Sequence, residues 1–262
     1  MTTTHDLDKA TTVWALGDYE RVAREVVAPF GPELVGACGI GPGLRVLDVG
    51  AGTGNVALAA AAAGADVVAC DPTAELLDVG RARAPELEWV RAGAEALPFA
   101  DGAFDVVTSS VGAMFAPDHA AAARELLRVC RPGGTLGMIN WPPDCWSAEF
   151  FAVFAPYAPP DPGPAPTLWG DERYVRGLLG DGVERLEATR GRLVIDHFAD
   201  PGALCRFYRE CFGPVVATYA ALTDHAALDR DFHAFAERTN RGTPGGPAVY
   251  DLDYLRMIAT RR

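Results

Sequence analysis

The stretch RVLDVGAGTGNVAL, residues 45–58, places three glycines, Gly50, Gly52 and Gly54, between an apolar run and an alanine-rich run. Residues 44–49 have the length and composition of a buried strand, and 53–63 are expected to form a helix. Glycine adopts backbone dihedrals that other residues avoid, and it leaves room for a ligand against the backbone. The stretch therefore predicts a strand, a glycine turn and a helix whose first N–H groups are free to meet a ligand.

The same alternation of strand and helix patterns continues along the chain. Strands are expected at 44–49, 66–70, 87–91, 104–109, 135–140, 183–198 and 249–260. Helices are expected at 53–63, 73–84, 118–130, 171–180, 200–222 and 224–240. The segment RPGG, residues 131–134, is expected to end one helix and lead into the next strand. This order predicts an α/β fold with a doubly wound, mostly parallel sheet of seven strands.

Two regions lie outside this alternation. Residues 5–38 read as two short helices interrupted at Gly17 and Pro29, followed by a turn at 39–43. Residues 141–169 are rich in proline and aromatic residues and are not expected to be regular throughout. A stretch of this length without regular structure is typical of functional loops, and its aromatic content argues against disorder.

Composition excludes several classes of function. The net charge of −12 argues against a nucleic-acid-binding face, and no apolar stretch reaches the roughly 18 residues of a membrane span. The first ten residues lack the pattern of a signal peptide, so a cytoplasmic protein is expected. The six cysteines form no CxxC pair and are expected to be reduced, and no metal site is predicted.

The spacing of the glycines separates two classes of ligand. A dinucleotide motif, G-x-G-x-x-G, would need a third glycine at position 55, where the chain has Asn55. The actual G-x-G-x-G after VLDV resembles motif I of the class I S-adenosylmethionine-dependent methyltransferases. A glycine turn without any ligand is the alternative for this motif taken alone.

Three further segments support the resemblance. They are VVACDPT at 67–73, LPFADGAFDVV at 97–107 and ELLRVCRPGGTLGMINW at 125–141. In order and spacing, the four segments resemble the UbiE/COQ5-like methyltransferases. The resemblance divides the single domain into an N-terminal helical lid at 1–43, a cofactor-binding core at 44–141, and cap insertions with the last strands at 142–262.

The resemblance also implies roles for individual residues. The methionine end of S-adenosylmethionine would lie against Asp48, Gly50 and Gly52, and Gly54 would also belong to the cofactor-binding turn. The ribose would be held by Asp71, with Pro72 beside the ribose or adenine, and the methyl group would face Ser110 and Val111. The family often has Asp at the position of Gly93, so adenine recognition would rest on Gly93, Ala94 and Glu95.

The acceptor would approach under a lid and a cap. Residues 12–23 resemble the segment that closes over the cofactor in related enzymes. The resemblance implies that Trp14 and Tyr19 are lid residues and that Tyr19 also lies against the cofactor. The alternative is that both side chains only anchor the helix in the core. We expect the stretch 141–169 to close over an apolar pocket, with Tyr157 or Trp141 in its wall. The other pocket candidates are Trp146, Phe150, Phe151, Phe154, Phe207, Tyr208 and Phe212.

Candidates for acid–base chemistry are few. His119, His197 and Tyr157 are the predicted catalytic groups, although Asp118 before His119 reads as a helix N-cap. Positioning alone supplies much of the rate of a methyl transfer, so a base is not required.

The sequence therefore predicts an enzyme that methylates a small, largely apolar molecule such as a quinone-like ring or a secondary metabolite. The alternatives are a methyltransferase fold that catalyses cyclisation-type chemistry and a non-catalytic binding module. The identity of the acceptor, the choice among O, N and C methylation, and the choice between monomer and homodimer stay open.

Overall fold

The computed structural model describes residues 13–159 and 163–262, and it contains one seven-stranded sheet in the order β3-β2-β1-β4-β5-β7-β6. The strands are β1 (Arg45–Val49), β2 (Asp66–Asp71), β3 (Glu88–Arg91), β4 (Phe104–Ser110), β5 (Cys130–Asn140), β6 (Val183–Phe198) and β7 (Ala248–Arg261). The first five strands pair in parallel, and β7 is antiparallel to both of its neighbours. The predicted doubly wound, mostly parallel sheet is confirmed.

Helices connect the strands, and others pack beyond them. They are α2 (Tyr19–Glu25), α3 (Phe30–Ala37), α4 (Asn55–Ala62), α5 (Ala74–Arg83), α6 (His119–Val129), α7 (Trp146–Phe154), α8 (Glu172–Leu179), α9 (Pro201–Cys211), α10 (Gly213–Ala221) and α11 (Ala226–Thr239). We call α2 and its flanking residues the lid segment, or lid, and we call α7, α9, α10 and α11 the cap. Neighbouring residues of β1, Val46 and Leu47, are both fully buried and belong to separate apolar cores. Both faces of the sheet are therefore covered, as a parallel sheet requires.

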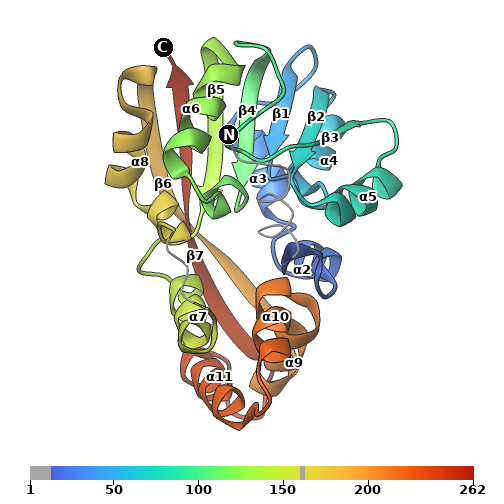
Figure 1. Ribbon diagram of the computed structural model, residues 1–262, viewed down its shortest axis with the longest axis vertical. Coiled ribbons are helices and arrows are strands. Elements are labelled where there is room, and N and C mark those ends of the chain that lie inside the picture. Colours follow the sequence, from blue (N-terminus) through green and yellow to red (C-terminus); the bar gives the residue numbers. More distant parts are fainter. Residues whose placement is uncertain (1–12, 160–162) are drawn as a thin grey trace.

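The cap is carried by the last two strands. The β6–β7 pair runs from Val183 opposite Arg261 to Phe198 opposite Ala248, and it leaves the sheet to reach α7, α9, α10 and α11 (Figure 1). In the cap, the ring of Phe198 lies 5.1 Å from that of Phe207. Because strands of the main sheet continue into the cap, the cap is held by the same hydrogen-bonded ladder as the core.

The stretch 141–169 is not regular throughout, as predicted, but it contains α7, because Trp146, Phe150 and Phe154 recur at helical spacing and bury one apolar face. Two other predictions about local structure are wrong. The predicted helix at 200–222 is two helices, α9, which ends at Cys211, and α10, which begins at Gly213. Gly213 packs so closely on the Val13 carbonyl that a Cβ there would overlap it.

The second wrong prediction concerns RPGG, residues 131–134, which lies inside β5 rather than before it. There the partner of β5 shifts from Phe104 opposite Cys130 to Val106 opposite Thr135, so the extra residues form an irregularity in the ladder. Gly133 has φ +70°, a conformation that glycine adopts readily. Residues 1–12 and 160–162 lie outside the described residues. The first of these ranges contains the start of the predicted lid, the start of the predicted first helix and the N-terminal segment without a signal pattern.

Candidate cofactor and acceptor site

The glycine turn lies between β1 and α4, where the order of the strands reverses between β1 and β4. All three glycines have positive φ: +67° at Gly50, +56° at Gly52 and +96° at Gly54. A Cβ on Gly50 would lie 2.6 Å from Gly112 Cα, and one on Gly54 would lie 2.5 Å from the indole of Trp89. A Cβ on Gly52 would meet only Tyr19, at 3.5 Å. Close packing therefore requires glycine at Gly50 and Gly54, whereas Gly52 faces open space.

Asp71 ends β2 and holds the glycine turn in place. Its carboxylate accepts a 2.9 Å hydrogen bond from the Gly52 N–H and a 2.8 Å bond from the Thr73 N–H. Burial raises the pKa of Asp71, and the two backbone donors oppose this shift. A carboxylate offers about four acceptor positions, so two further donors, such as the hydroxyls of a diol, can be accommodated.

Asp48, near the end of β1, is buried beneath the turn. Its carboxylate accepts a 3.0 Å hydrogen bond from the Thr108 hydroxyl and a 3.1 Å bond from the Ala57 N–H. Burial raises its pKa to about 7, with a smaller contribution from the negative charge of Asp71. Near neutral pH the protonated and ionised forms of Asp48 are therefore both populated.

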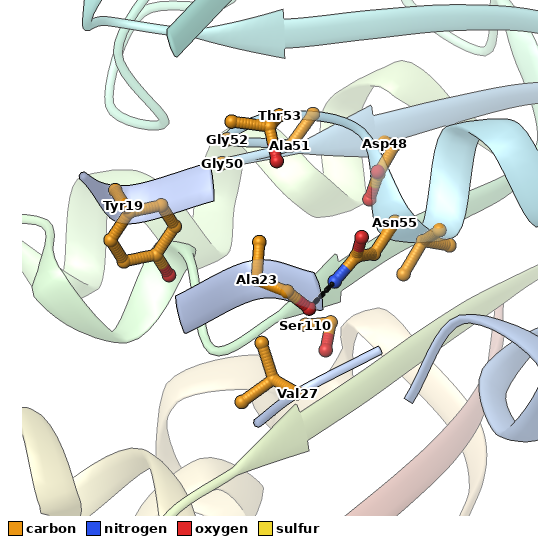
Figure 2. A pocket seen from close by; sticks show the side chains of 11 residues that line it. Tyr19, Ala23, Val27, Asp48, Gly50, Ala51, Gly52, Thr53, Asn55 and Ser110 are labelled. Atoms are coloured by element: carbon orange, nitrogen blue, oxygen red, sulfur yellow. Dashed lines mark hydrogen bonds between the residues drawn. The ribbon is translucent and has the colours of Figure 1, made fainter. Parts of the chain in front are cut away.

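Helix α2 covers the turn and borders a partly open cavity of about 380 Å³, a volume that includes space continuous with solvent. Its lining consists of Tyr19, Ala23, Val27, Asp48, Gly50, Ala51, Gly52, Thr53, Asn55, Val56 and Ser110. Figure 2 shows the amide of Asn55 reaching across to α2, where it donates a 2.7 Å hydrogen bond to the Ala23 carbonyl. Asn55 was noted in the sequence only as a missing glycine, and its contact with the lid was not predicted.

The lid is also anchored on the cap. The guanidinium carbon of Arg21 lies 5.0 Å from the ring of Phe207, and a Cβ on Gly17 would lie 2.8 Å from the Cys211 carbonyl. The segment that precedes and forms α2 is thus held by both α4 and α9. The ring of Trp14 lies 4.7 Å from that of Phe115, and Trp14 also lines the second cavity described below.

A second partly open cavity, of about 460 Å³ including space continuous with solvent, adjoins the first and is almost wholly apolar. Its lining consists of Trp14, Tyr19, Val22, Val26, Val27, Val111, Phe115, Trp141, Trp146, Ser147, Phe150, Phe151, Tyr208, Phe212 and Leu252. Tyr19 and Val27 line both cavities. The predicted pocket residues Trp14, Trp141, Trp146 and Tyr208 are therefore brought together, whereas Phe115 and the valines at 22, 26 and 27 were not predicted.

The two cavities meet at the end of β4. Ser110 lines the first cavity and Val111 lines the second. Val111 has φ +52°, and among the described residues it is the one non-glycine with positive φ. A β-branched side chain in this region is strained by about 1–3 kcal/mol, and such strain concentrates at functional sites. The sequence showed no sign of this conformation.

The predicted adenine-binding residues lie beside Asp71 but outside both cavity linings. Asp71 pairs with Arg91 in the ladder between β2 and β3, and the Asp71 carbonyl accepts a 3.2 Å bond from the Ala92 N–H. Gly93 and Ala94 follow and are buried, and Glu95 is half-buried. The Pro72 carbonyl accepts a 3.0 Å hydrogen bond from the Arg91 guanidinium.

The two predicted histidines are not in the site. His119 is buried and bonded on both ring nitrogens, to the Tyr174 hydroxyl at 3.0 Å and the Met114 carbonyl at 3.1 Å. Burial lowers its pKa, so it is a neutral structural residue. Asp118 caps its helix, as predicted, by accepting a 2.9 Å bond from the Ala121 N–H. His197 is exposed on β6 with its ring 4.3 Å from that of Phe198.

Two predicted aromatic residues also lie elsewhere. Tyr157 is half-buried in a 3₁₀ turn after α7, and its hydroxyl donates a 2.5 Å hydrogen bond to Asp231. Phe207 packs between Phe198 and Arg21. Neither residue lines either of these two cavities. The structure thus places Tyr157 away from both cavities and Trp141 in the wall of the second, and the roles of both in substrate binding or catalysis stay predictions.

The remaining chemistry of the site is limited. The lining of the second cavity contains no histidine, carboxylate or cation, and its titratable groups are Tyr19 and Tyr208. Within 13–159 and 163–262, no group of three His, Cys, Asp or Glu side chains is arranged to hold a metal ion. In the same ranges, no helix has the length and apolarity needed to cross a membrane.

Comparisons with known proteins agree with this geometry. A family described as "Methyltransferase domain" matches residues 47–138. The chain is 43% identical over 121 residues to a demethylmenaquinone methyltransferase of Beutenbergia cavernae, covering 46% of this chain and 50% of that protein.

Solved structures share the fold. The YcgJ protein of Bacillus subtilis aligns with a TM-score of 0.62 and 20% identity, covering 89% of this chain and 99% of that one. The [4+2]-cyclase SpnF aligns with a TM-score of 0.56 and 19% identity, covering 94% and 87%.

The strand order, the glycine turn and the family match together place the chain among the class I S-adenosylmethionine-dependent methyltransferases, with the UbiE-like pattern. Within that class, it belongs to the same family as the uncharacterized protein Rv1405c of Mycobacterium tuberculosis. The two are 50% identical over 257 residues, which cover 95% of this chain and 93% of that protein.

Proposed function

We propose that the protein binds S-adenosylmethionine in the first cavity and transfers its methyl group to a small, largely apolar molecule in the second. The observation that carries the proposal is that the two cavities adjoin and share Tyr19 and Val27 as lining residues. A donor and an acceptor in adjoining cavities are held close together, and such positioning supplies much of the rate of a bimolecular reaction.

The residues of the first cavity suit the proposed cofactor. S-adenosylmethionine, when bound, supplies a methyl group on a positively charged sulfur. The bare face of Gly52 and the carboxylate of Asp48 suit its methionine end, and Asp71 suits the ribose diol. We assign the adenine to the turn after β3, formed by Gly93, Ala94 and Glu95, with Pro72 beside it.

The lid and cap have the task of excluding water and aligning the acceptor. The Asn55 bond to the Ala23 carbonyl holds α2 over the turn. Val111 and the aromatic side chains of α7 and α9 orient the acceptor toward the first cavity. We propose that 1–43 acts as the lid, 44–141 as the cofactor-binding core, and 142–262 as the cap and the strands that carry it.

A quinone-like ring is the leading class of acceptor. Supporting observations are the aromatic lining of the second cavity and the similarity over half its length to an enzyme named for demethylmenaquinone. A flat apolar ring stacks on such walls with favourable geometry and buries apolar area.

Cyclisation-type chemistry with the cofactor as a scaffold is the second candidate. It is favoured by the lack of a histidine or carboxylate in the described lining of the second cavity, and the fold is shared with a [4+2]-cyclase. The experiment is incubation of the protein with S-adenosylmethionine and a panel of quinols, phenols and amines. Formation of S-adenosylhomocysteine that depends on one acceptor supports methyl transfer. Product formation from an acceptor without S-adenosylhomocysteine would support the alternative and contradict the proposal.

A further inference from the structure

The chain contains seven tyrosines, all within the described residues, and their hydroxyl groups divide into two sets. Five have hydrogen-bond partners inside the protein. These pairs are Tyr157 with Asp231, Tyr174 with His119, Tyr219 with Asp229, Tyr250 with the Ala236 carbonyl, and Tyr254 with Glu33. The hydroxyls of Tyr19 and Tyr208 have no partner among the described residues.

The two unpartnered tyrosines are the two that line the second cavity. Tyr208 is 5% exposed and is packed against Phe150, whose ring lies 4.8 Å away. Neither hydroxyl is one of the fully buried polar atoms without a partner, so both stay accessible from the cavity that their side chains line. The other five tyrosine hydroxyls are bonded within the fold, and these two are therefore free to bond a molecule in the cavity.

The surroundings determine what these hydroxyls offer. Burial raises the pKa of Tyr19 to about 12 and raises that of Tyr208 as well, so both phenols are protonated near neutral pH. A protonated phenol donates one hydrogen bond. Ser147, the other hydroxyl in the lining, already interacts with Cys145. The cavity therefore presents two neutral donors within apolar walls.

We infer that Tyr19 and Tyr208 together bind an oxygen of the acceptor, and that the enzyme selects flat apolar molecules that carry a carbonyl, hydroxyl or phenolate oxygen. Because Tyr19 also borders the first cavity, this oxygen lies on the same side of the acceptor as the atom to be methylated. Two donors on one oxygen also favour its anionic form, so an acceptor that has already given its proton to water is held there as a phenolate or enolate. This inference rests on the proposed function, since it assigns the second cavity to the acceptor.

The test uses two probes of similar shape on the full-length protein, with S-adenosylhomocysteine present. Naphthalene has no oxygen, and 2-acetylnaphthalene has a carbonyl oxygen that only accepts hydrogen bonds. Equilibrium dialysis measures the affinity of each probe for the wild type, Tyr208→Phe and Tyr19→Phe. Tyr219→Phe is the matched control, because it removes a hydroxyl that bonds Asp229 outside the cavity.

Tyr208→Phe and Tyr19→Phe are each expected to weaken binding of 2-acetylnaphthalene about three- to tenfold, while affinity for naphthalene stays within about twofold. The control variant is expected to leave both affinities unchanged. Equal changes for the two probes, no change for 2-acetylnaphthalene, or failure of the wild type to bind either probe would overturn the inference.

Calorimetric titration with S-adenosylhomocysteine on the same samples distinguishes failure of the tyrosine inference from failure of the proposed function. Cofactor binding with no dependence of the probes on either hydroxyl would refute the role of the tyrosines alone. Absence of cofactor binding by the wild type would refute the proposed function itself.

Discussion

Substitution of single glycines by alanine separates the packing role of the turn from its binding role. Gly50→Ala places a Cβ 2.6 Å from the Gly112 backbone, whereas Gly52→Ala places one 3.5 Å from Tyr19. Gly39 is exposed with φ +63° and has nothing within 4 Å of a Cβ, so Gly39→Ala serves as the control.

The expected stabilities follow from two contributions. An alanine at positive φ costs roughly 1–2 kcal/mol, part of which is offset by about 0.4–1 kcal/mol from the restricted unfolded chain. This net cost of about 1 kcal/mol applies to Gly39→Ala and Gly52→Ala. The backbone overlap in Gly50→Ala adds about 1–3 kcal/mol, the typical cost of overpacking, for a total of roughly 2–4 kcal/mol.

The expected affinities run in a different order. The Cβ in Gly52→Ala occupies space between the turn and Tyr19, so affinity for S-adenosylhomocysteine should fall at least about tenfold, or roughly 1.4 kcal/mol. Gly39→Ala should bind as the wild type does. Urea unfolding followed by circular dichroism measures stability, and calorimetry measures affinity. The reasoning fails if Gly52→Ala and Gly39→Ala bind equally well, or if Gly50→Ala is as stable as Gly39→Ala.

The remaining predictions concern one buried acid, one lid contact and the cap. Burial raises the folded-state pKa of Asp48 to about 7, whereas the unfolded-state pKa is about 3.9. Between these two values the folded protein keeps the proton and the unfolded chain has lost it. The stability that the protonated Asp48 contributes is therefore lost as the pH rises from about 4 to 7. Asp48→Asn should therefore make the free energy of unfolding fall less steeply with pH over this range, by up to about 1.4 kcal/mol per pH unit. Urea unfolding at several pH values measures this slope, and the same slope in the variant and the wild type would contradict the burial argument. Asn55→Ala removes the bond to the lid and should weaken S-adenosylhomocysteine binding about three- to tenfold in calorimetry, while the free energy of unfolding changes by less than about 1.5 kcal/mol; wild-type affinity would show that the bond does not hold the lid. Tyr157→Phe should keep the kcat and KM of the wild type, whereas Trp141→Leu should raise the KM for a verified acceptor with cofactor affinity within about threefold; the opposite pattern would place the acceptor outside the second cavity.

The sheet could be predicted from the sequence because its signals are local. Continuous apolar runs such as residues 44–49 and 66–70 read as buried strands, and the structure begins or ends them within a residue of the prediction. The N-cap at Asp118 is equally local, since one side chain and the next turn of helix determine it.

The irregular parts of the site depend on contacts between distant segments. Asn55 and Ala23 are 32 residues apart, and nothing in either segment indicates that they meet. Composition could not separate Trp141 from Tyr157, because both are aromatic residues in one proline-rich stretch. The difference arises from their places in the fold: Trp141 directly follows β5 and lines the second cavity, whereas Tyr157 lies beyond α7 and bonds Asp231 on α11.

A crystal structure with bound S-adenosylhomocysteine tests the central claim most directly, because it shows where the cofactor lies relative to the second cavity. The account predicts the amino-acid end of the ligand over Gly52 beneath α2. It predicts the ribose hydroxyls within about 2.5–3.0 Å of the Asp71 carboxylate oxygens, and the sulfur beside Val111 facing the aromatic cavity. A ligand bound elsewhere, or one whose sulfur points away from that cavity, would contradict the proposal that methyl transfer takes place between the two cavities.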